Sequence, residues 1–454
     1  MFIETALLTL LALGVLIILA LLSARFPFAF TMIIIVINEQ FFGLLPSKFG
    51  GYDLVRMVAG PALLLLAIII QIVFRQGRFR IGLKNCEDSY FPVVLAIIGV
   101  VVFSTLWGGI FIYKQSLMML IFQPALFFYY FLYVYLCFFS PGKTQILRFF
   151  RYFVATALIV SALMAIDGYV LHEAHLFTYA NVSERLGFVR IIVFVTGLVW
   201  AYYYSLASAD EKKYTSRKKF LFGLAAFLLL VSILFVQLDR QVIFSCLLTT
   251  AVVTFSMEAL RRFFLVVGLF LSLSLSTLLA VNPNYNFDNT FLGSMVSLTR
   301  AEAQLKRSGI GIRLEAMDFF YNHFKNTYGL GFGVLGSRRE YRNPVSLGLE
   351  HGYNLNDLSL AGIIFRFGIP GLLVIIATVR KMFRDTSSIL KKSSDPDIRS
   401  ITRGIRYTII YFIIVFPLTT FLFYGEKAVY FALMFFLVER IRNIVSEEAL
   451  EVKV

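Results

Sequence analysis

The chain has 454 residues, of which 59% are hydrophobic and 15% are charged, and its mean hydropathy is +0.80. This composition excludes an ordinary soluble globular protein and predicts an all-α integral membrane protein. The net charge of +15 would suit a nucleic-acid partner, but most basic residues lie in short loops between apolar runs. The positive-inside rule explains that distribution, so we expect no nucleic-acid partner.

Apolar runs of about 20 residues, long enough to cross a bilayer, recur from end to end of the chain. They lie at 3–23, 57–74, 90–113, 117–140, 152–171, 191–208, 220–237, 242–259, 263–281, 358–379, 407–424 and 428–439. A further run at 27–45 contains Asn38, Glu39 and Gln40, and it could span, re-enter or lie against the bundle. We therefore predict 12 to 14 membrane spans. The first run lacks a preceding basic segment and a small-residue cleavage motif, which favours a retained helix over a removable signal peptide.

Basic loops alternate with these runs and are expected on the cytoplasmic side. They are 75–84, 143–151, 212–219, 261–262 and 380–406. The opposite side then receives 172–190, 237–241 and the long stretch 282–357. The predicted organisation is an N-terminal transmembrane bundle (1–281), one large extracytoplasmic helical loop carrying part of the site (282–357), and C-terminal transmembrane helices with a cytoplasmic tail (358–454).

A loop as long as 282–357 in a compact chain is usually either functional or disordered. This loop has a regular sequence pattern, so we expect it to be structured. In IRLEAMDFFYNHF (312–324) apolar residues recur at helical spacing, which predicts an amphipathic helix. The following YGLGFGVLG (328–336) contains the glycines that tight backbone turns require. The loop therefore is expected to build a site.

Basic residues also gather on the predicted outer side, where they are normally depleted. They are Arg185, Arg190, Arg240, Arg300, Lys306, Arg307, Arg313, Arg338, Arg339 and Arg342. A guanidinium matches phosphate oxygens bidentately, so this set indicates an anionic partner, with contact to lipid head groups as the alternative. Arg240 lies in a short interruption between two spans, where a charge is costly. We therefore expect that Arg240 has a functional role, pairs with Asp239, or extends its side chain to the membrane interface.

The polar stretch LGLEHGYNLNDL (347–358) stands immediately before an apolar run. His351 could accept a proton near neutral pH, because imidazole titrates there. Its companions are Glu350, Tyr353, Asn354 and Asp357. The alternative is that Asn354 to Asp357 cap the following helix and that His351 is a bystander. Both interpretations stay open on this stretch alone.

No metal ligand set is apparent in the sequence. The four histidines, His172, His175, His323 and His351, lack clustered acids or cysteines, and HEAH (172–175) is a weak motif. The three cysteines, Cys86, Cys137 and Cys246, are far apart and suggest core positions and not a disulfide framework. We expect no metal and no other cofactor.

Three segments in series resemble the O-antigen ligase and O-antigen polymerase superfamily of polytopic membrane glycan transferases. They are DRQVIFS with Arg240, GIRLEAMDFFYNHFKNTYGLGFG with Arg313, and EHGYNLNDLSLAGIIFRFGIPG with His351, Asn354, Gly368 and Gly371. Two departures exist. Asp239 stands where the family often has serine, and Gly352 and Tyr353 separate His351 from the asparagine that often follows directly.

The resemblance implies a GT-C-like fold in the bacterial inner (cytoplasmic) membrane with an active site that faces the periplasm. It implies a donor glycan on undecaprenyl diphosphate, with Arg240 and Arg313 holding the diphosphate and His351 activating the acceptor hydroxyl. Further substrate contacts are expected from Arg185, Arg190, Arg338, Arg339, Glu350, Tyr353, Asn354 and Asp357. Membrane lipids, a chain-length regulator and a flippase of the same pathway are the implied partners.

The compact loop between Arg313 and His351 favours a repeat-unit polymerase over a ligase that transfers the finished chain to lipid A core. A transporter or flippase of an anionic lipid-linked substrate is the alternative of another class. Transporters commonly contain internal repeats with broken helices, and no repeat relates 1–230 to 231–454.

Overall fold

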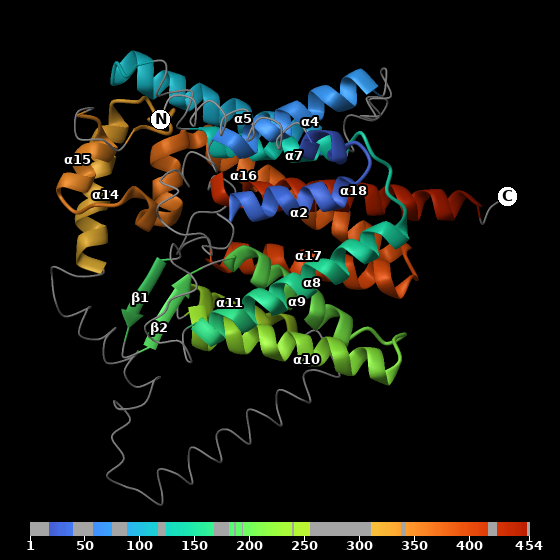
Figure 1. The fold of residues 1–454 in the computed structure, drawn as a ribbon. Helices are drawn as coiled ribbons and strands as arrows, with labels where there is room; N and C mark the ends of the chain where they lie inside the picture. Colours follow the sequence, from blue (N-terminus) through green and yellow to red (C-terminus); the bar gives the residue numbers. More distant parts are fainter. Residues whose placement is uncertain are drawn as a thin grey trace, which may run out of the picture.

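The structure is a computed structural model that describes residues 18–39, 58–74, 89–116, 124–167, 181–185, 188–192, 194–237, 240–254, 310–336, 342–415 and 425–451. Within these ranges the chain is a bundle of helices (Figure 1). The first half contains α2 (Pro27–Asn38), α4 (Gly60–Phe74), α5 (Phe91–Leu106), α7 (Phe131–Leu136), α8 (Lys143–Ile166), α9 (Val195–Ala209), α10 (Ser216–Ser232) and α11 (Arg240–Thr254). The second half contains α14 (Ile310–Lys325), α15 (Pro344–Glu350), α16 (Ser359–Lys392), α17 (Pro396–Val415) and α18 (Ala428–Glu451). The predicted all-α class is confirmed.

Three of the described helices are long and apolar enough to cross a membrane, at Phe91–Ile112, Lys143–Ile166 and Leu360–Lys392. Shorter apolar helices lie at Pro27–Asn38, Gly60–Val73, Ala125–Leu136 and Val242–Thr254. The total of 12 to 14 spans stays a prediction, because several apolar runs, such as 3–23 and 263–281, fall wholly or largely outside the described residues.

Irregular helical turns extend several of these elements. A π-helix, η5 (Trp107–Ile112), continues α5, and another, η8 (Ile233–Gln237), continues α10. Short 3₁₀ helices precede α7, α16 and α18, at η6 (Ala125–Tyr130), η11 (Leu355–Leu358) and η12 (Gly425–Lys427). Such turns are frequent where a helix adapts to a neighbour or to a functional site. Two of them, η5 and η11, border the site described below.

A short antiparallel hairpin between α8 and α9 is an addition that the sequence patterning did not predict. It pairs β1 (Asn181–Arg185) with β2 (Phe188–Ile192), and Ser183 stands opposite Arg190 in the register. It leaves the helical class unchanged, since it is two short strands beside a bundle of helices (Figure 1).

The core is formed by the long helices and is rich in aromatic side chains. Every residue of α18 from Ala428 to Val438 is buried, so this helix is surrounded by protein on all sides. The same core cluster contains side chains from α5, α9 and α17, so the first and third predicted domains share one core. Cys246 is buried, as expected for a core position.

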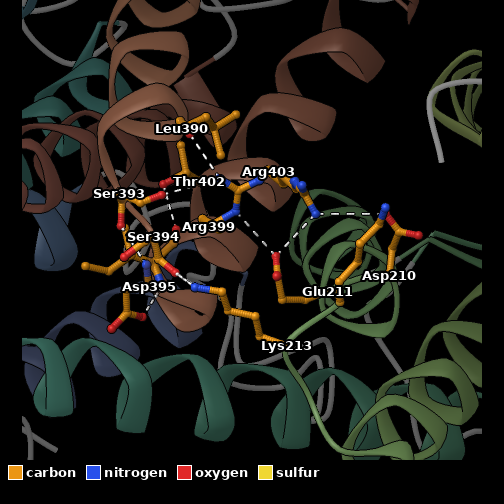
Figure 2. A network of polar contacts seen from close by, with 12 residues as sticks. Asp210, Glu211, Lys213, Leu390, Ser393, Ser394, Asp395, Arg399, Thr402 and Arg403 are labelled. Carbon is orange, nitrogen blue, oxygen red and sulfur yellow. Dashed lines mark hydrogen bonds and ion pairs between the residues drawn. The ribbon is translucent and has the colours of Figure 1, made fainter. Parts of the chain in front are cut away.

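The two ends of the bundle carry different elements. The outer end is defined here by α14, α15, the β1–β2 hairpin and the start of α11, which lie together at the left of Figure 1. The inner end is defined by the α9–α10 turn, the α16–α17 turn and the start of α8. At the inner end Lys143 pairs with Asp395. Arg403 pairs with Glu211 at 3.3 Å (Figure 2). The basic loops 143–151, 212–219 and 380–406 thus share one end of the molecule.

Candidate functional site

The glycine-rich segment after α14 packs against a break in α16. The backbone of α16 leaves helical geometry at Gly368, where φ is 65° and ψ is −165°. There Gly333 N donates to Arg366 O at 2.6 Å, and Ile369 N donates to Gly329 O at 3.1 Å. A Cβ at Gly331 would overlap the carbonyl oxygen of Arg366, and its φ of 81° also favours glycine. The glycines are therefore required for this close backbone contact.

The opposite side of the same segment packs against the end of α5 and the π-helix η5. Ser104 Oγ donates to Leu330 O at 3.1 Å, and Val334 N donates to Thr105 Oγ1 at 3.1 Å. Trp107 Nε1 donates to Thr327 O at 3.3 Å. Buried polar groups paired in this way hold a segment rigidly, so α14 and its connection are fixed onto two apolar helices.

Helix α15 is short and depends on its N-cap. Asn343 is fully buried, and its Oδ1 accepts hydrogen bonds from Val345 N at 2.9 Å and Ser346 N at 3.0 Å. Its Nδ2 donates to Gly336 O at 2.7 Å, which ties the two ends of the 337–341 segment together. Pro344 at the first helical position completes a favourable start. The C-cap of this helix is His351.

His351 and Tyr353 meet at Phe319 of α14. The Phe319 ring centroid lies 5.8 Å from that of His351 and 5.6 Å from that of Tyr353, and the two latter rings are 5.9 Å apart. Tyr353 Oη donates to Glu315 Oε2 at 3.3 Å. The structure therefore brings two predicted site residues from the 347–358 stretch onto the predicted amphipathic helix. His351 is exposed to solvent.

A second histidine, His323, packs against the same ring at 4.9 Å. Partial burial lowers the pKa of His323, because a charged imidazolium loses hydration there. The pKa of Tyr353 is raised by desolvation and by the neighbouring Glu315 carboxylate, so its hydroxyl stays a hydrogen-bond donor. The cluster thus offers one exposed imidazole, His351, and one hydroxyl that is held by a carboxylate.

Arg313 lies near the start of the same helix and is partly exposed. Phe319 follows six residues later, which places it about 120° around the helix axis from Arg313 and about 9 Å along it. Arg313 and His351 therefore belong to one small helical unit but stand on different flanks of α14. A ligand that contacts both must therefore reach across α14.

Arg240 is the first residue of α11. The sequence placed it in the interruption 237–241, of which Gln237 ends η8 and 238–239 lie outside the described residues. Arg185 and Arg190 lie on β1 and β2, and β2 contacts η8. These three arginines thus belong to adjoining elements at the outer end (Figure 1). The side chains of Arg185, Arg190 and Arg240 lie outside the described part of the structure, and so does any contact that they make with Arg313 or His351.

The other predicted site residues are placed less completely. Arg338 and Arg339 lie outside the described residues, between Gly336 and Arg342. Glu350 ends α15 and is exposed, and Asn354 is exposed directly before η11. Asp357 lies within η11, and its side chain also lies outside the described residues.

The predicted cap of the following helix needs a correction. Helix α16 begins at Ser359, and its N-cap residue is Leu358, which makes no side-chain cap hydrogen bond. The reason is that Leu355–Leu358 first forms a 3₁₀ turn, which moves the start of the α-helix beyond Asn354 and Asp357. His351 in turn is the C-cap of α15.

Among the described residues, no group of three or more His, Cys, Asp or Glu side chains could hold a metal ion. The chemistry available at the outer end is accordingly that of guanidinium groups, an imidazole, a tyrosine and carboxylates. Such a set can bind an anion and move a proton to or from a hydroxyl group.

Three residues of this unit were not singled out from the sequence: Glu315, Phe319 and Asn343. Glu315 and Phe319 are ordinary members of an amphipathic pattern, and nothing local distinguishes them. Asn343 followed by Pro344 is a recognisable helix start, since asparagine is a preferred N-cap and proline suits the first helical position.

Comparison with known proteins adds no relative. No protein-family model matches the chain, and no curated protein sequence matches it. The site is therefore interpreted from its own residues.

Proposed function

We propose that this protein is a metal-independent, inverting glycan transferase of the bacterial inner membrane. It has a GT-C-like fold of 12 to 14 spans, with the outer end facing the periplasm. Its donor is an oligosaccharide on undecaprenyl diphosphate, and it acts as the polymerase of O-antigen or a related surface polysaccharide. The observation that carries the proposal is the position of His351 against α14, on the helical unit that contains Arg313, at the same end as Arg240 (Figure 1).

The proposed reaction is a single displacement. The acceptor hydroxyl oxygen attacks the anomeric carbon, the bond from that carbon to the phosphate oxygen breaks, and undecaprenyl diphosphate leaves with the electron pair. His351 takes the hydroxyl proton. Arg240 and Arg313 stabilise the charge that develops on the diphosphate, which gives the same electrostatic help that a divalent cation would give.

The remaining polar residues of the outer end have supporting roles in this proposal. Tyr353, held by Glu315, contacts the acceptor sugar beside His351. Arg185, Arg190, Arg338 and Arg339 contact phosphate or glycan further out, and Glu350, Asn354 and Asp357 contact the acceptor.

Two other functions are the alternatives, and their loss would have different consequences for the glycan. A ligase would use the same donor and a lipid A core acceptor. A transporter of an anionic lipid-linked substrate is favoured by one observation, the break of α16 at Gly368, because broken helices form binding sites in transporters. Here the broken turn forms backbone hydrogen bonds with Gly329, which accepts, and Gly333, which donates, and this favours a structural role for the break.

The test uses a strain deleted for the gene and complemented with single variants at equal expression. Arg240→Ala, Arg313→Ala and His351→Ala should each abolish the long-chain glycan ladder. His323→Gln is the matched control, since His323 packs on the same Phe319 ring yet has no assigned role, and it should keep the ladder. Wild-type ladders from all three alanine variants would refute the proposal.

The same strain distinguishes the alternatives. Loss of a polymerase leaves a single repeat on the lipid core, whereas loss of a ligase leaves long chains on the carrier lipid. Loss of a transporter leaves repeats unextended and uncapped on the cytoplasmic side.

Purified protein provides an independent test of the arginine mechanism. Polymerisation of a synthetic lipid-linked repeat should proceed unchanged in excess chelator, because the arginines supply the positive charge. Activity that disappears with chelator and returns with a divalent cation would contradict it.

A further inference from the structure

Helix α14 exposes an apolar stripe that the described part of the chain does not cover. Leu314 is 59% exposed, Met317 is 40% exposed and Tyr321 is 49% exposed. These three positions fall within about 60° of one another around the helix axis. The covered face is a different one, formed by Ala316 and Phe320, which are almost completely buried in the small core of the outer end.

The stripe is an extension of the covered face and not an isolated side chain. Phe324 packs against the small core and lies between Phe320 and Tyr321 around the helix. From Ala316 to Leu314 this side of α14 spans about 160° and is apolar except for Arg313. It is wider than the roughly 100° that a helix on a protein surface normally buries. Since contiguous exposed apolar surface is unusual where only water is present, the uncovered half needs an apolar neighbour.

The direction of α14 indicates what that neighbour is. Figure 1 shows α14 running across the ends of the long apolar helices, at a steep angle to α2, α8 and α18. A helix placed across the ends of membrane spans lies along the plane of the bilayer surface. An uncovered side of such a helix at the rim of the bundle meets lipid.

Exposed apolar residues also occur after α14 and on the neighbouring apolar helix α16. Tyr328 follows α14 and is 85% exposed. The next residue, Gly329, is bonded to Ile369 of α16 through Ile369 N and Gly329 O at 3.1 Å. Ile369 is exposed together with Leu373 and Ile376, on one side of a helix long and apolar enough to span. Exposed apolar residues therefore stand both on α14 and on the part of α16 that its connection contacts.

The polar border of the stripe has the composition of a membrane interface. Lys325 Nζ lies 4.5 Å above the centre of the Tyr321 ring. Tyrosine and lysine are typical at the level of the lipid head groups, where a ring can be half buried and an ammonium group can reach water or phosphate. Asp318 and Asn322 lie beyond this border and are exposed.

We propose that α14 is an interfacial helix, whose stripe of Leu314, Met317 and Tyr321 lies in the boundary between head groups and acyl chains at the outer end. The bilayer is thus a structural partner of the unit that carries His351 and Tyr353, and it sets the depth of that unit at the level of the head groups. This inference does not depend on the reaction assigned above.

Depth-dependent fluorescence quenching tests the proposal on the full-length protein in liposomes. Single cysteines replace Leu314, Met317 or Tyr321, in a background where Cys86, Cys137 and Cys246 are alanine, and each is labelled with bimane. Asp318→Cys and Asn322→Cys are the matched controls on the same helix, and Leu373→Cys marks a deeper position on α16. Phospholipids brominated close to the head groups are the lipid quencher, and iodide is the aqueous quencher.

The expected result is that bromines near the head groups quench the three stripe labels at least about two-fold more than the Asp318 and Asn322 labels. Iodide should show the reverse order, and the Leu373 label should respond best to bromines near the chain ends. Stripe labels that iodide quenches as strongly as the controls would overturn the proposal. Stripe labels protected from both quenchers would also overturn it, because protein would then cover the stripe. Equal thermal unfolding of all labelled proteins in detergent verifies that folding is unchanged.

Discussion

The two ends of this helix bundle are held together by different interactions. At the inner end charged residues of both signs neutralise each other. Glu211 lies 3.3 Å from Arg403 and 3.7 Å from Arg399 (Figure 2). Lys218 pairs with Asp397 at 2.9 Å. At the outer end the glycine-rich segment is held by backbone hydrogen bonds, and aromatic rings gather around Phe319. The comparison shows that ion pairs join helices at the inner end, whereas backbone hydrogen bonds and ring contacts hold most of the outer end, where Glu315 and Tyr353 form a charged contact.

We expect the largest loss of stability from a substitution at the glycine contact of the outer end. Gly331→Ala forces a Cβ onto the carbonyl of Arg366 in backbone of positive φ, so we expect a loss of about 3 kcal/mol in unfolding free energy. Thermal unfolding in detergent measures it.

Gly352→Ala is the matched control for that variant, because Gly352 has a similar φ of 77° but nothing within 4 Å of its added Cβ. It should lose only about 1 kcal/mol of unfolding free energy from backbone strain. Equal melting temperatures for the two variants would show that the close contact between Gly331 and α16 does not contribute to stability.

Asn343 gives the next largest effect, because it closes the 337–341 segment and caps the helix that ends at His351. Asn343→Ala removes two accepted hydrogen bonds and one donated hydrogen bond at a buried site, which should cost about 2 kcal/mol. Asn343→Asp keeps the cap and loses the donor to Gly336 O, so its melting temperature should lie between those of the wild type and Asn343→Ala. Asn322→Ala on the exposed side of α14 serves as the control and should be nearly neutral.

At the inner end a single carboxylate should matter less, since its partners are partly exposed and screened. Glu211→Gln leaves Arg399 and Arg403 without that charge, and we expect a loss of about 1 kcal/mol that shrinks at high salt. Glu447→Gln, at a residue whose side chain is 61% exposed, is the control and should change the melting temperature very little. A Glu211 effect that does not depend on salt would contradict an electrostatic role for the inner end.

The smallest expected effect is a pH dependence of the inner end. Burial alone would raise the pKa of Asp397, but hydrogen bonds from Tyr214 and Lys218 and the charges of Lys218 and Lys143 outweigh it, so the pKa is lowered. A lowered folded-state pKa adds stability above the ordinary value of 3.8, and this stability is lost as the pH falls through the folded value. The difference in melting temperature between wild type and Asp397→Asn should therefore be constant near neutral pH and vanish in acid below 3.8. A difference that persists there would contradict this assignment.

Prediction from the sequence succeeded where the pattern is local. The helix at 312–324 was predicted from its apolar spacing and is α14, and the break after it was predicted from its glycines. The start of a helix at Arg240 follows from the short polar interruption between two apolar runs. The hairpin at 181–192 was not predicted, because NVSERLGFVR has no strong alternation and its flanking apolar run suggested only helix.

Prediction was weaker where a residue depends on a distant neighbour. One of the two interpretations of 347–358 placed the cap of α16 at Asn354–Asp357, but a 3₁₀ turn intervenes and Leu358 takes that position. The length of α16 was also underestimated, since its apolar run ends near 379 while the helix continues to Lys392 with charged residues that pair within the bundle, such as Asp385 with Arg442.

The sequence by itself determined that this is a helical chain with apolar helices of membrane-spanning length, and that its polar and basic residues concentrate in a few segments. These properties follow from composition and from spacing over one or two turns, which are written locally in the chain. Only the tertiary structure decided that Phe319 would gather His351 and Tyr353, that Glu315 would hold Tyr353, and that Gly333 would lie against Thr105. Such neighbours come from elements far apart in sequence, and their contact depends on how whole helices pack and not on any local pattern.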